Sequence, residues 1–434
     1  MPIIIPANSA SSGAFEVANS LMLNNPGDAA TLSRSNSSGT STQKGTISVW
    51  VKGGEEPSGN NQTTLASWGD ANNHGALLWN GSDKIDAFDY QSGYASQLQT
   101  NAVLTDVAAW YHIVYSWDTT LGTADDRQKI YINGVEQTYS TRTNYSQNAA
   151  TSWNANSYSV RVGALNSSSY FRGYMAEVVF IDGTQYAASD FGEFEEDSGI
   201  WRPIKVSGLT FGTNGAYLDF QDSANLGNDV NGGTDFTETN LAATDQMIDT
   251  CTKNFPTLNP LEGYSANVGT NTYSQGNLQV LTPSSGNGNT LSTIGVSSGK
   301  WYSEFYIKAS SGVQRALVGV SGDVGSTLLA GNNMGSLSGA LDVGYMGNDG
   351  DKFVSGSESS YGGSAFSNGD VIGVALDLDN NTVNFAQNNS FKGTIAIAST
   401  GTWHMGCGDV SGGIAATIVA NYGQNSSFAG SITA

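Results

Sequence analysis

The sequence is poor in the residues on which disulfide-linked and cofactor-dependent proteins rely. Its 434 residues include two cysteines, three histidines and eight prolines. Cys251 and Cys407 stand far apart, and neither has a second cysteine nearby. We therefore predict two free thiols, which argues against a disulfide framework.

Positive charge and long apolar runs are also scarce. Seventeen basic residues against 38 acidic ones give a formal net charge of −21, which repels nucleic acid phosphates and anionic lipid headgroups. The apolar runs are too short to span a membrane, and the opening Met1-Pro-Ile-Ile-Ile-Pro6 does not resemble a secretory signal. We expect neither nucleic acid binding nor membrane insertion, and we expect synthesis in the cytoplasm.

What the chain has in abundance is glycine, with 54 residues, together with serine, threonine and asparagine. This composition favours short strands joined by tight turns. We predict an all-β chain with two antiparallel, jelly-roll-like β-sandwich domains joined by an extended connector. The predicted parts are an N-terminal arm at 1–14, a first sandwich at 15–205, the connector at 206–262 and a second sandwich at 263–434.

The second sandwich shows the clearest strand pattern. Ile372, Val374 and Leu376 alternate on one face, and Val383 and Phe385 follow after a turn, which predicts a hairpin with one buried side. Other segments occur around it in a fixed order: Gly299-Lys-Trp-Tyr-Ser-Glu-Phe-Tyr-Ile, Val318-Gly-Val, Val343-Gly-Tyr and Asn421-Tyr-Gly-Gln-Asn-Ser-Ser-Phe. This region resembles the SPRY family of interaction domains. The resemblance implies partner binding through loops at one edge, with these candidate residues: Arg315, Asn333, Asp349 and Tyr361.

The first sandwich carries a turn signal at Asn133-Gly134, since a type I′ turn needs positive φ at both central positions. The segments that identify it are Trp110-Tyr-His-Ile-Val, Ile130-Tyr-Ile-Asn-Gly-Val, Arg161-Val-Gly and Phe171-Arg-Gly-Tyr-Met-Ala-Glu-Val-Val-Phe. In this order they resemble the laminin-G and concanavalin A-like lectin superfamily. Members of that superfamily bind glycans, proteins or calcium, so the resemblance predicts the fold more sharply than the ligand.

The connector has weak periodicity but a recurring pattern of Asp-Phe and Asn-Pro-Leu. It closely resembles a connector that follows a lectin-like domain in phage structural and tail proteins. We predict that it packs in extended form along the sandwiches, with three aromatic anchors: Phe220, Phe236 and Phe255.

No catalytic arrangement is favoured by the sequence. The one dense acidic run, Glu193-Phe-Glu-Glu-Asp197, lacks the alternation that would put three acids on one strand face, as glucan hydrolases need. The chain has no Gly-x-Ser-x-Gly elbow near a histidine. We predict a protein that is not an enzyme and requires no cofactor.

Loop residues are the candidates for ligand binding. Flat rings and fixed polar groups suit a sugar, and the candidates are Trp153, Tyr170, Phe171 and the loop histidine His74. The alternative is that each ring caps a local apolar cluster. Calcium is possible on rim loops that carry Asp and Asn oxygens, and for it we select Asp70, Asn73 and Asp118, with turn formation as the alternative role. The run Asn348-Asp-Gly-Asp351 has the same composition.

Together these features predict a non-enzymatic bacteriophage virion protein. We expect a tail or fibre adhesin that binds host surface glycan or protein through sandwich loops, present in many copies so that weak contacts add up. Its other partners would be virion proteins. The alternative is a capsid or tail decoration protein that contacts only other virion proteins.

Overall fold

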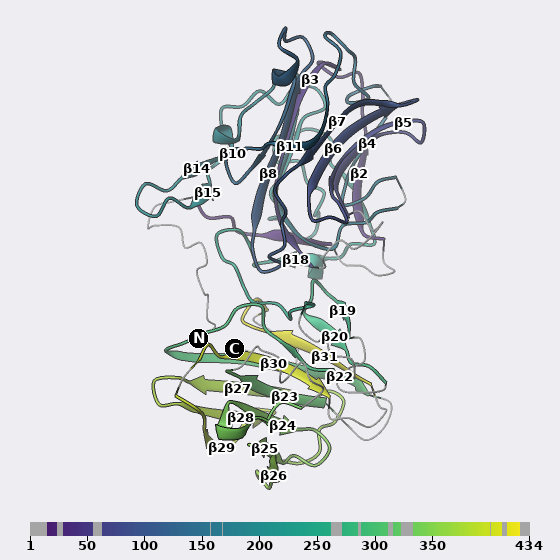
Figure 1. The fold of residues 1–434 in the computed structure, drawn as a ribbon. Helices are drawn as coiled ribbons and strands as arrows, with labels where there is room; N and C mark the ends of the chain where they lie inside the picture. The colour runs from purple at the N-terminus through teal and green to yellow at the C-terminus, as the bar shows by residue number, and fades with distance from the viewer. Residues whose placement is uncertain are drawn as a thin grey trace. The chain divides into compact units, whose positions relative to one another are not determined.

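The computed structural model describes most of the chain as short strands and turns (Figure 1). The described residues are 15–23, 29–54, 63–156, 158–166, 168–261, 271–284, 288–310, 316–322, 333–399, 401–409 and 415–425. Helical structure in them is limited to four single 3₁₀ turns: η1 (Ala124–Asp126), η2 (Ala188–Asp190), η3 (Ala243–Asp245) and η4 (Ser338–Ala340). The predicted all-β fold class is therefore confirmed. Across the described part of the chain, a search for membrane-spanning helices finds none.

The chain divides into two compact units between Asn254 and Phe255. The first unit is built on two large antiparallel sheets and a small hairpin. One sheet has, in spatial order, β10 (Val135–Glu136), β9 (Gln128–Ile132), β8 (Tyr111–Asp118), β3 (Lys44–Gly53), β13 (Gly173–Asp182), β1 (Ser20–Leu23) and β18 (Gln246–Met247), with β16 (Ala216–Leu218) also paired to β13. The other has β11 (Tyr139–Thr143), β7 (Tyr94–Thr100), β6 (Ile85–Gln91), β5 (Asn73–Trp79), β4 (Thr63–Gly69), β12 (Ser159–Val162), β2 (Thr31–Ser35) and β17 (Thr237–Thr239). The hairpin is β14 (Gly192–Phe194) with β15 (Trp201–Pro203).

Alternating residues of both sheets meet in one buried core. Ile47, Val49 and Val51 of β3 contribute from one sheet, and Leu77 and Trp79 of β5 contribute from the other. Large rings fill its centre, and the side chains that stack there are Trp68, Trp117, Trp153, Phe180 and Phe236. Burial of so much apolar area is the main force that holds a sandwich of this kind together.

The turn between β9 and β10 has the conformation predicted from its sequence. Asn133 and Gly134 have φ of 47° and 80°, and Val135 pairs with Ile132 across the turn. Gly134 lies against the indole ring of Trp201, where an added Cβ would come within 2.3 Å of a ring carbon. The turn therefore needs glycine both for its backbone and for this close approach.

The predicted connector differs from what the structure shows. Residues 206–254 lie within the first unit, where β16, β17 and β18 extend its two sheets by pairing with β13, β2 and β1. Phe220 and Phe236 are 2% and 3% exposed and belong to the core of that unit, and Phe255 is equally buried at the start of the second. The three predicted anchors are thus buried, but most of the segment is an integral part of a sandwich.

Polar groups fix this segment in place. The carboxylate of Asp182 at the end of β13 accepts hydrogen bonds from the backbone N–H groups of Thr40, Ser41 and Asn214 at 2.7, 2.9 and 3.0 Å. The guanidinium of Arg34 donates to the carbonyl oxygens of Asn214 and Thr234 at 2.5 and 2.9 Å. Buried polar groups cost free energy unless they are paired, so these bonds specify the path of the chain.

The second unit is also formed by two antiparallel sheets. One has the order β19 (Thr272–Ser274), β20 (Gln279–Leu281), β31 (Ala416–Asn421), β22 (Lys300–Ser310), β27 (Val371–Asp377), β28 (Thr382–Gln387) and β29 (Ser390–Ala396). The other has β21 (Thr290–Leu291), β30 (His404–Asp409), β23 (Ala316–Ser321), β24 (Asp342–Met346), β25 (Lys352–Val354) and β26 (Ser357–Ser359). The predicted hairpin is present as β27 and β28, with Val374 opposite Phe385 and Leu376 opposite Val383.

Candidate functional site

Two of the predicted sugar-binding rings are buried, so their assignment was wrong. Trp153 is 0% exposed and Phe171 is 1% exposed, and both belong to the core of the first unit. Trp153 stands edge-on to Trp68 and Trp117, where no ligand can reach its face. Tyr170, in the loop before β13, is partly buried. Polar neighbours in the sequence suggested exposed loops, but both rings pack into the core of the first unit.

The loop residues predicted for the second unit are not brought together as one site. Tyr361 is 7% exposed, and its hydroxyl donates to the carbonyl of Gly393 and accepts from the backbone N–H of Phe385, so it is a core residue and its assignment to a binding surface was wrong. Asn333 is partly buried, and Asp349 is exposed. Arg315 lies outside the described residues.

The predicted calcium ligands of the first unit already have protein partners. Asp70 accepts backbone hydrogen bonds from Asn72 and Asn73 at 2.8 and 2.7 Å, which is a turn role and lowers its pKa. Asp118 forms an ion pair with Lys44 at 2.8 Å and accepts a hydrogen bond from the Thr120 hydroxyl. Burial tends to raise the pKa of Asp118, but these hydrogen bonds outweigh it and lower the pKa. The turn-forming alternative describes these residues better than a calcium site.

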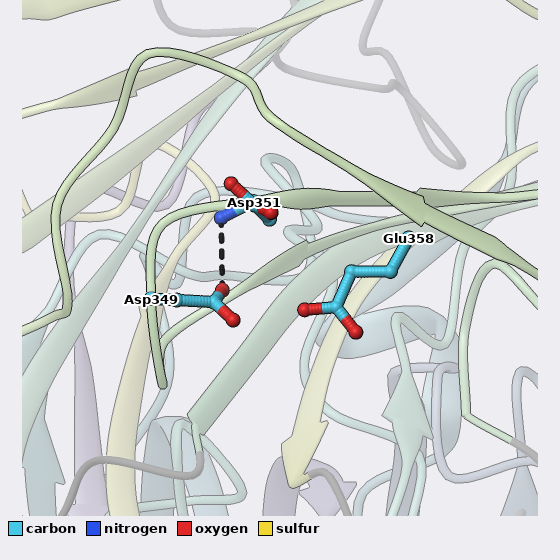
Figure 2. A group of neighbouring side chains, drawn as sticks. All are labelled: Asp349, Asp351 and Glu358. Atoms are coloured by element: carbon cyan, nitrogen blue, oxygen red, sulfur yellow. Dashed lines mark hydrogen bonds between the residues drawn. The ribbon is translucent and has the colours of Figure 1, made fainter.

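A group of carboxylates forms instead at the edge of the second unit (Figure 2). Asp349 and Asp351 stand on the turn between β24 and β25, and Glu358 stands on β26, with carboxylate oxygens within 4.8 Å of one another. A hydrogen bond with Asp349 is the main reason why the pKa of Glu358 is raised. Oxygen ligands of this kind suit calcium or magnesium. Asp349 was a candidate from the sequence, whereas Glu358 enters only through the pairing of β25 with β26.

The acidic run after the last long strand has a structural role. Arg202 of β15 forms ion pairs with Glu193 at 2.8 Å and with Glu195 at 3.1 Å, across the hairpin of β14 and β15. These carboxylates therefore stabilise the hairpin of β14 and β15, and Glu193 lies on a strand.

The candidate binding surface of the first unit is the outer face of the second sheet. His74 of β5 pairs with Tyr90 of β6, which pairs with Tyr94 of β7, while Phe88 stands two residues before Tyr90. Their rings contact one another with centroids 5.6–5.8 Å apart. We call His74, Tyr90 and Tyr94 the aromatic face, whereas Phe88 is 8% exposed and packs beneath them in a small buried cluster with Ala76 and Leu78. Tyr94 is 58% exposed, although large rings are usually buried.

The aromatic face follows from the period of a strand. Ile85, Ala87 and Asp89 of β6 point into the sandwich, so Asp86, Phe88 and Tyr90 point outward. Sequence reasoning found His74 alone and placed it in a loop, which was wrong because it lies on β5. Phe88 and Tyr90 alternate with core residues along one strand, and Tyr94 follows after a tight turn. This pattern could have predicted from the sequence that aromatic rings gather beside His74.

Fixed polar groups lie beside these rings on the same face. The side-chain amides of Gln97 and Gln99 on β7 donate to the carboxylate of Asp86 at 3.1 and 3.4 Å. Burial raises the pKa of Asp86 despite these bonds. The imidazole Nδ1 of His74 is covered and makes no hydrogen bond within the described part of the chain. Rings next to oriented amides and carboxylates are the combination by which proteins hold sugars.

Comparison with known proteins agrees with this architecture. Residues 24–188 match the family model described as the concanavalin A-like lectin/glucanases superfamily, and residues 286–403 match the SPRY domain model. No curated protein matches the chain.

Among solved structures, the chain is similar to the SPRY domain of human HERC1, with 19% identity and a TM-score of 0.31 over 38% of this chain and 96% of that one. It is similar to the TRIM65 PSpry domain, with 17% identity and a TM-score of 0.30 over 38% and 92%. It is also similar to domain 4 of AbnA, an extracellular arabinanase from Geobacillus stearothermophilus in complex with arabinotriose, with 23% identity and a TM-score of 0.27 over 34% and 64%. The chain thus carries an N-terminal domain of the concanavalin A-like superfamily and a C-terminal SPRY domain.

Proposed function

We propose that the protein is a non-enzymatic binding protein that attaches to a surface glycan through the aromatic face of its first domain. The exposure of Tyr94 beside Tyr90 and His74 is the observation that carries this proposal. An exposed ring is a flat apolar surface in water, and the apolar face of a sugar ring covers it at little entropic cost because the sheet is rigid.

We also propose that the protein acts as part of a bacteriophage particle. The resemblance of residues 206–262 to a connector of phage tail proteins supports a bacteriophage virion protein, acting as a tail or fibre adhesin on the host surface. Its location would then be the virion, assembled after synthesis in the host cytoplasm. Many copies per particle would convert weak contacts of single domains into firm attachment. The net charge of −21 disfavours nucleic acid and anionic membranes as partners.

Substitution of the most exposed ring tests the proposal. Tyr94→Ala should weaken binding of the purified full-length protein to polysaccharide from the envelope of the host about fivefold, because one stacked ring contributes about 1 kcal/mol. The matched control is Phe391→Ala, which removes a ring of similar exposure, 54%, from β29 of the second unit. Equal binding by wild type and Tyr94→Ala, or equal loss in both variants, would count against the aromatic face.

A second candidate is a decoration protein that contacts only other virion proteins. The observation that favours it is an apolar patch around Trp201, where Phe194 packs edge-on at 4.8 Å and the side chains of Val135, Phe194 and Ile200 are 55%, 53% and 40% exposed. Exposed apolar patches often mark protein contacts. Imaging of labelled particles separates the two functions, because an adhesin must stand where the aromatic face can reach the host.

A further inference from the structure

The second unit has an apolar pocket at one end of its sandwich. It encloses about 350 Å³ when its open mouth is included. Three buried side chains and three partly exposed ones form most of its wall, and they are Trp403, Met405 and Tyr422, and Ile294, Val296 and Trp301, respectively. Because half of this wall is partly exposed, the pocket reaches the surface of the domain.

The pocket lies at the end of the sandwich away from the acidic turn of Asp349. Met405 is opposite Val320 of β23, near the end of that strand. The turn of Asp349 follows Met346, which is opposite Leu317 near the start of the same strand. The pocket is therefore separate from the edge loops that the SPRY resemblance selects.

The hydroxyl and indole groups in the wall of the pocket already have partners. The hydroxyl of Ser303 donates to the sulfur of Met405 at 2.8 Å, and that of Tyr422 donates to the carbonyl of Met405 at 3.3 Å. The indole N–H of Trp301 donates to the carbonyl of Ser298 at 2.5 Å. A sugar or a charged group would lose its hydration here and gain little in return, so the pocket suits an aliphatic side chain.

The N-terminal arm, which lies outside the described residues, contains an aliphatic segment of this kind. It is the run of three isoleucines at residues 3–5. Pro2 and Pro6 flank this run and have no backbone N–H to donate, which disfavours its addition to the interior of a sheet. Burial of one isoleucine side chain stabilises a protein by about 1.5–3 kcal/mol. A pocket buries such a side chain without any strand pairing.

Hydrogen bonds and an ion pair hold the base of the arm next to the chain that leads into the pocket. The backbone N–H of Val17 donates to the hydroxyl of Thr252 at 3.0 Å, and the carboxylate of Glu16 contacts the ammonium of Lys253 at 3.2 Å. Pro256, which also lines the pocket, follows three residues after Lys253. The arm therefore begins close, along the chain, to one wall of the pocket.

The link between this base and the isoleucines is long enough to reach the pocket. Residues 6–14 consist mainly of alanine, serine and glycine. At about 3.3 Å per residue they extend to about 30 Å. A short flexible tether of this kind keeps the isoleucines at a millimolar effective concentration, so that even a weak contact is well occupied.

We propose that an isoleucine of residues 3–5 inserts into this pocket of the same chain, so that the SPRY domain binds the N-terminal arm. A second copy is the less favoured source of the arm, because each copy carries a net charge of −21 and the copies repel one another. The inference does not depend on the proposed glycan binding, and its test uses no glycan.

Disulfide trapping in the full-length chain tests the inference. Ile4→Cys is combined with Ile294→Cys, and the native Cys251 and Cys407 do not interfere because both are fully buried. Under mild oxidation we expect an intramolecular disulfide to form at least tenfold faster than in a control chain with Ile4→Cys and Phe391→Cys. Phe391 is 54% exposed on β29, which is three strands from β22 in the same sheet, about 14 Å away and outside the pocket.

A third chain separates recognition from reach. Ile3→Ser and Ile5→Ser, added to Ile4→Cys and Ile294→Cys, keep both thiols and the tether but remove the remaining apolar side chains. We expect trapping to slow to the rate of the control. Val296→Cys in place of Ile294→Cys repeats the test at a second position of the wall.

Two results would overturn the inference. The first is an equal rate of trapping in the pocket pairs, the control pair and the serine variant, which would mean that the arm meets all cysteines by chance. The second is a disulfide between two chains, seen as a dimer in the absence of reductant, which would show that the pocket holds the arm of a second copy.

Discussion

Glu177 is a buried carboxyl group at a bulge of β13. The bulge lies between Ala176 and Val179, and Glu177 itself has a φ of 51°. Its side chain is 5% exposed and accepts a hydrogen bond from the hydroxyl of Tyr217 on β16. Burial raises the pKa of Glu177 to about 7, and the hydrogen bond from Tyr217 only partly offsets this effect. The residue thus links stability to pH in the physiological range.

Replacement of Glu177 by glutamine should remove this pH dependence. Between pH 4.5 and about 7 the unfolded carboxyl group ionises while the folded one stays protonated, so wild type loses stability as the pH rises and Glu177→Gln does not. The difference between the two proteins should change by up to about 3 kcal/mol across this interval, at about 1.4 kcal/mol per pH unit. Urea unfolding of both at a series of pH values measures it. If the free energies of unfolding of wild type and Glu177→Gln changed with pH in parallel, Glu177 would ionise normally in the folded state.

At the scale of elements, the turn between β9 and β10 packs against the indole ring of Trp201. Gly134→Ala should destabilise the first unit by about 1–3 kcal/mol, because it combines a strained positive φ with overpacking against the indole. Gly122→Ala is the matched control, since an added Cβ there meets nothing within 4 Å. Thermal unfolding followed by tryptophan fluorescence measures both. A melting temperature for Gly134→Ala equal to that of the control would mean that the turn adapts freely.

Strands long enough to show an alternating pattern were predictable from the sequence, whereas the shortest strands were not. β27 and β28 alternate over seven and six residues, so their buried side was evident. β17 and β18 have three and two residues, too few to show a period, and they therefore looked like part of a connector, whereas the short apolar run at β16 could be recognised as a strand candidate. The same limit applies to the site. His74 could be found as a polar residue, whereas the burial of Trp153 depends on which loops close the sandwich.

At the scale of the whole molecule, the first domain extends to Asn254 and depends on its last fifty residues. Lys52 of β3 has a side chain that is 0% exposed, and its ammonium contacts the carboxylate of Asp249 and the side-chain oxygen of Asn254, both at 2.8 Å. The indole N–H of Trp110 donates to the same carboxylate at 3.0 Å. Removal of one partner from a buried ion pair generally costs about 3–5 kcal/mol, because the other charge is left uncompensated.

Two truncated chains test whether the first domain ends at Asn254 or at Lys205. A chain ending at Asn254 should retain the near-ultraviolet circular dichroism of the buried tryptophan rings and a cooperative thermal transition. A chain ending at Lys205 should lose both, because Lys52 would lose the carboxylate of Asp249, the core would lack Phe220 and Phe236, and the sheets would lose β16, β17 and β18. Native-like spectra and the same melting temperature for the shorter chain would show that residues 206–254 are a connector after all.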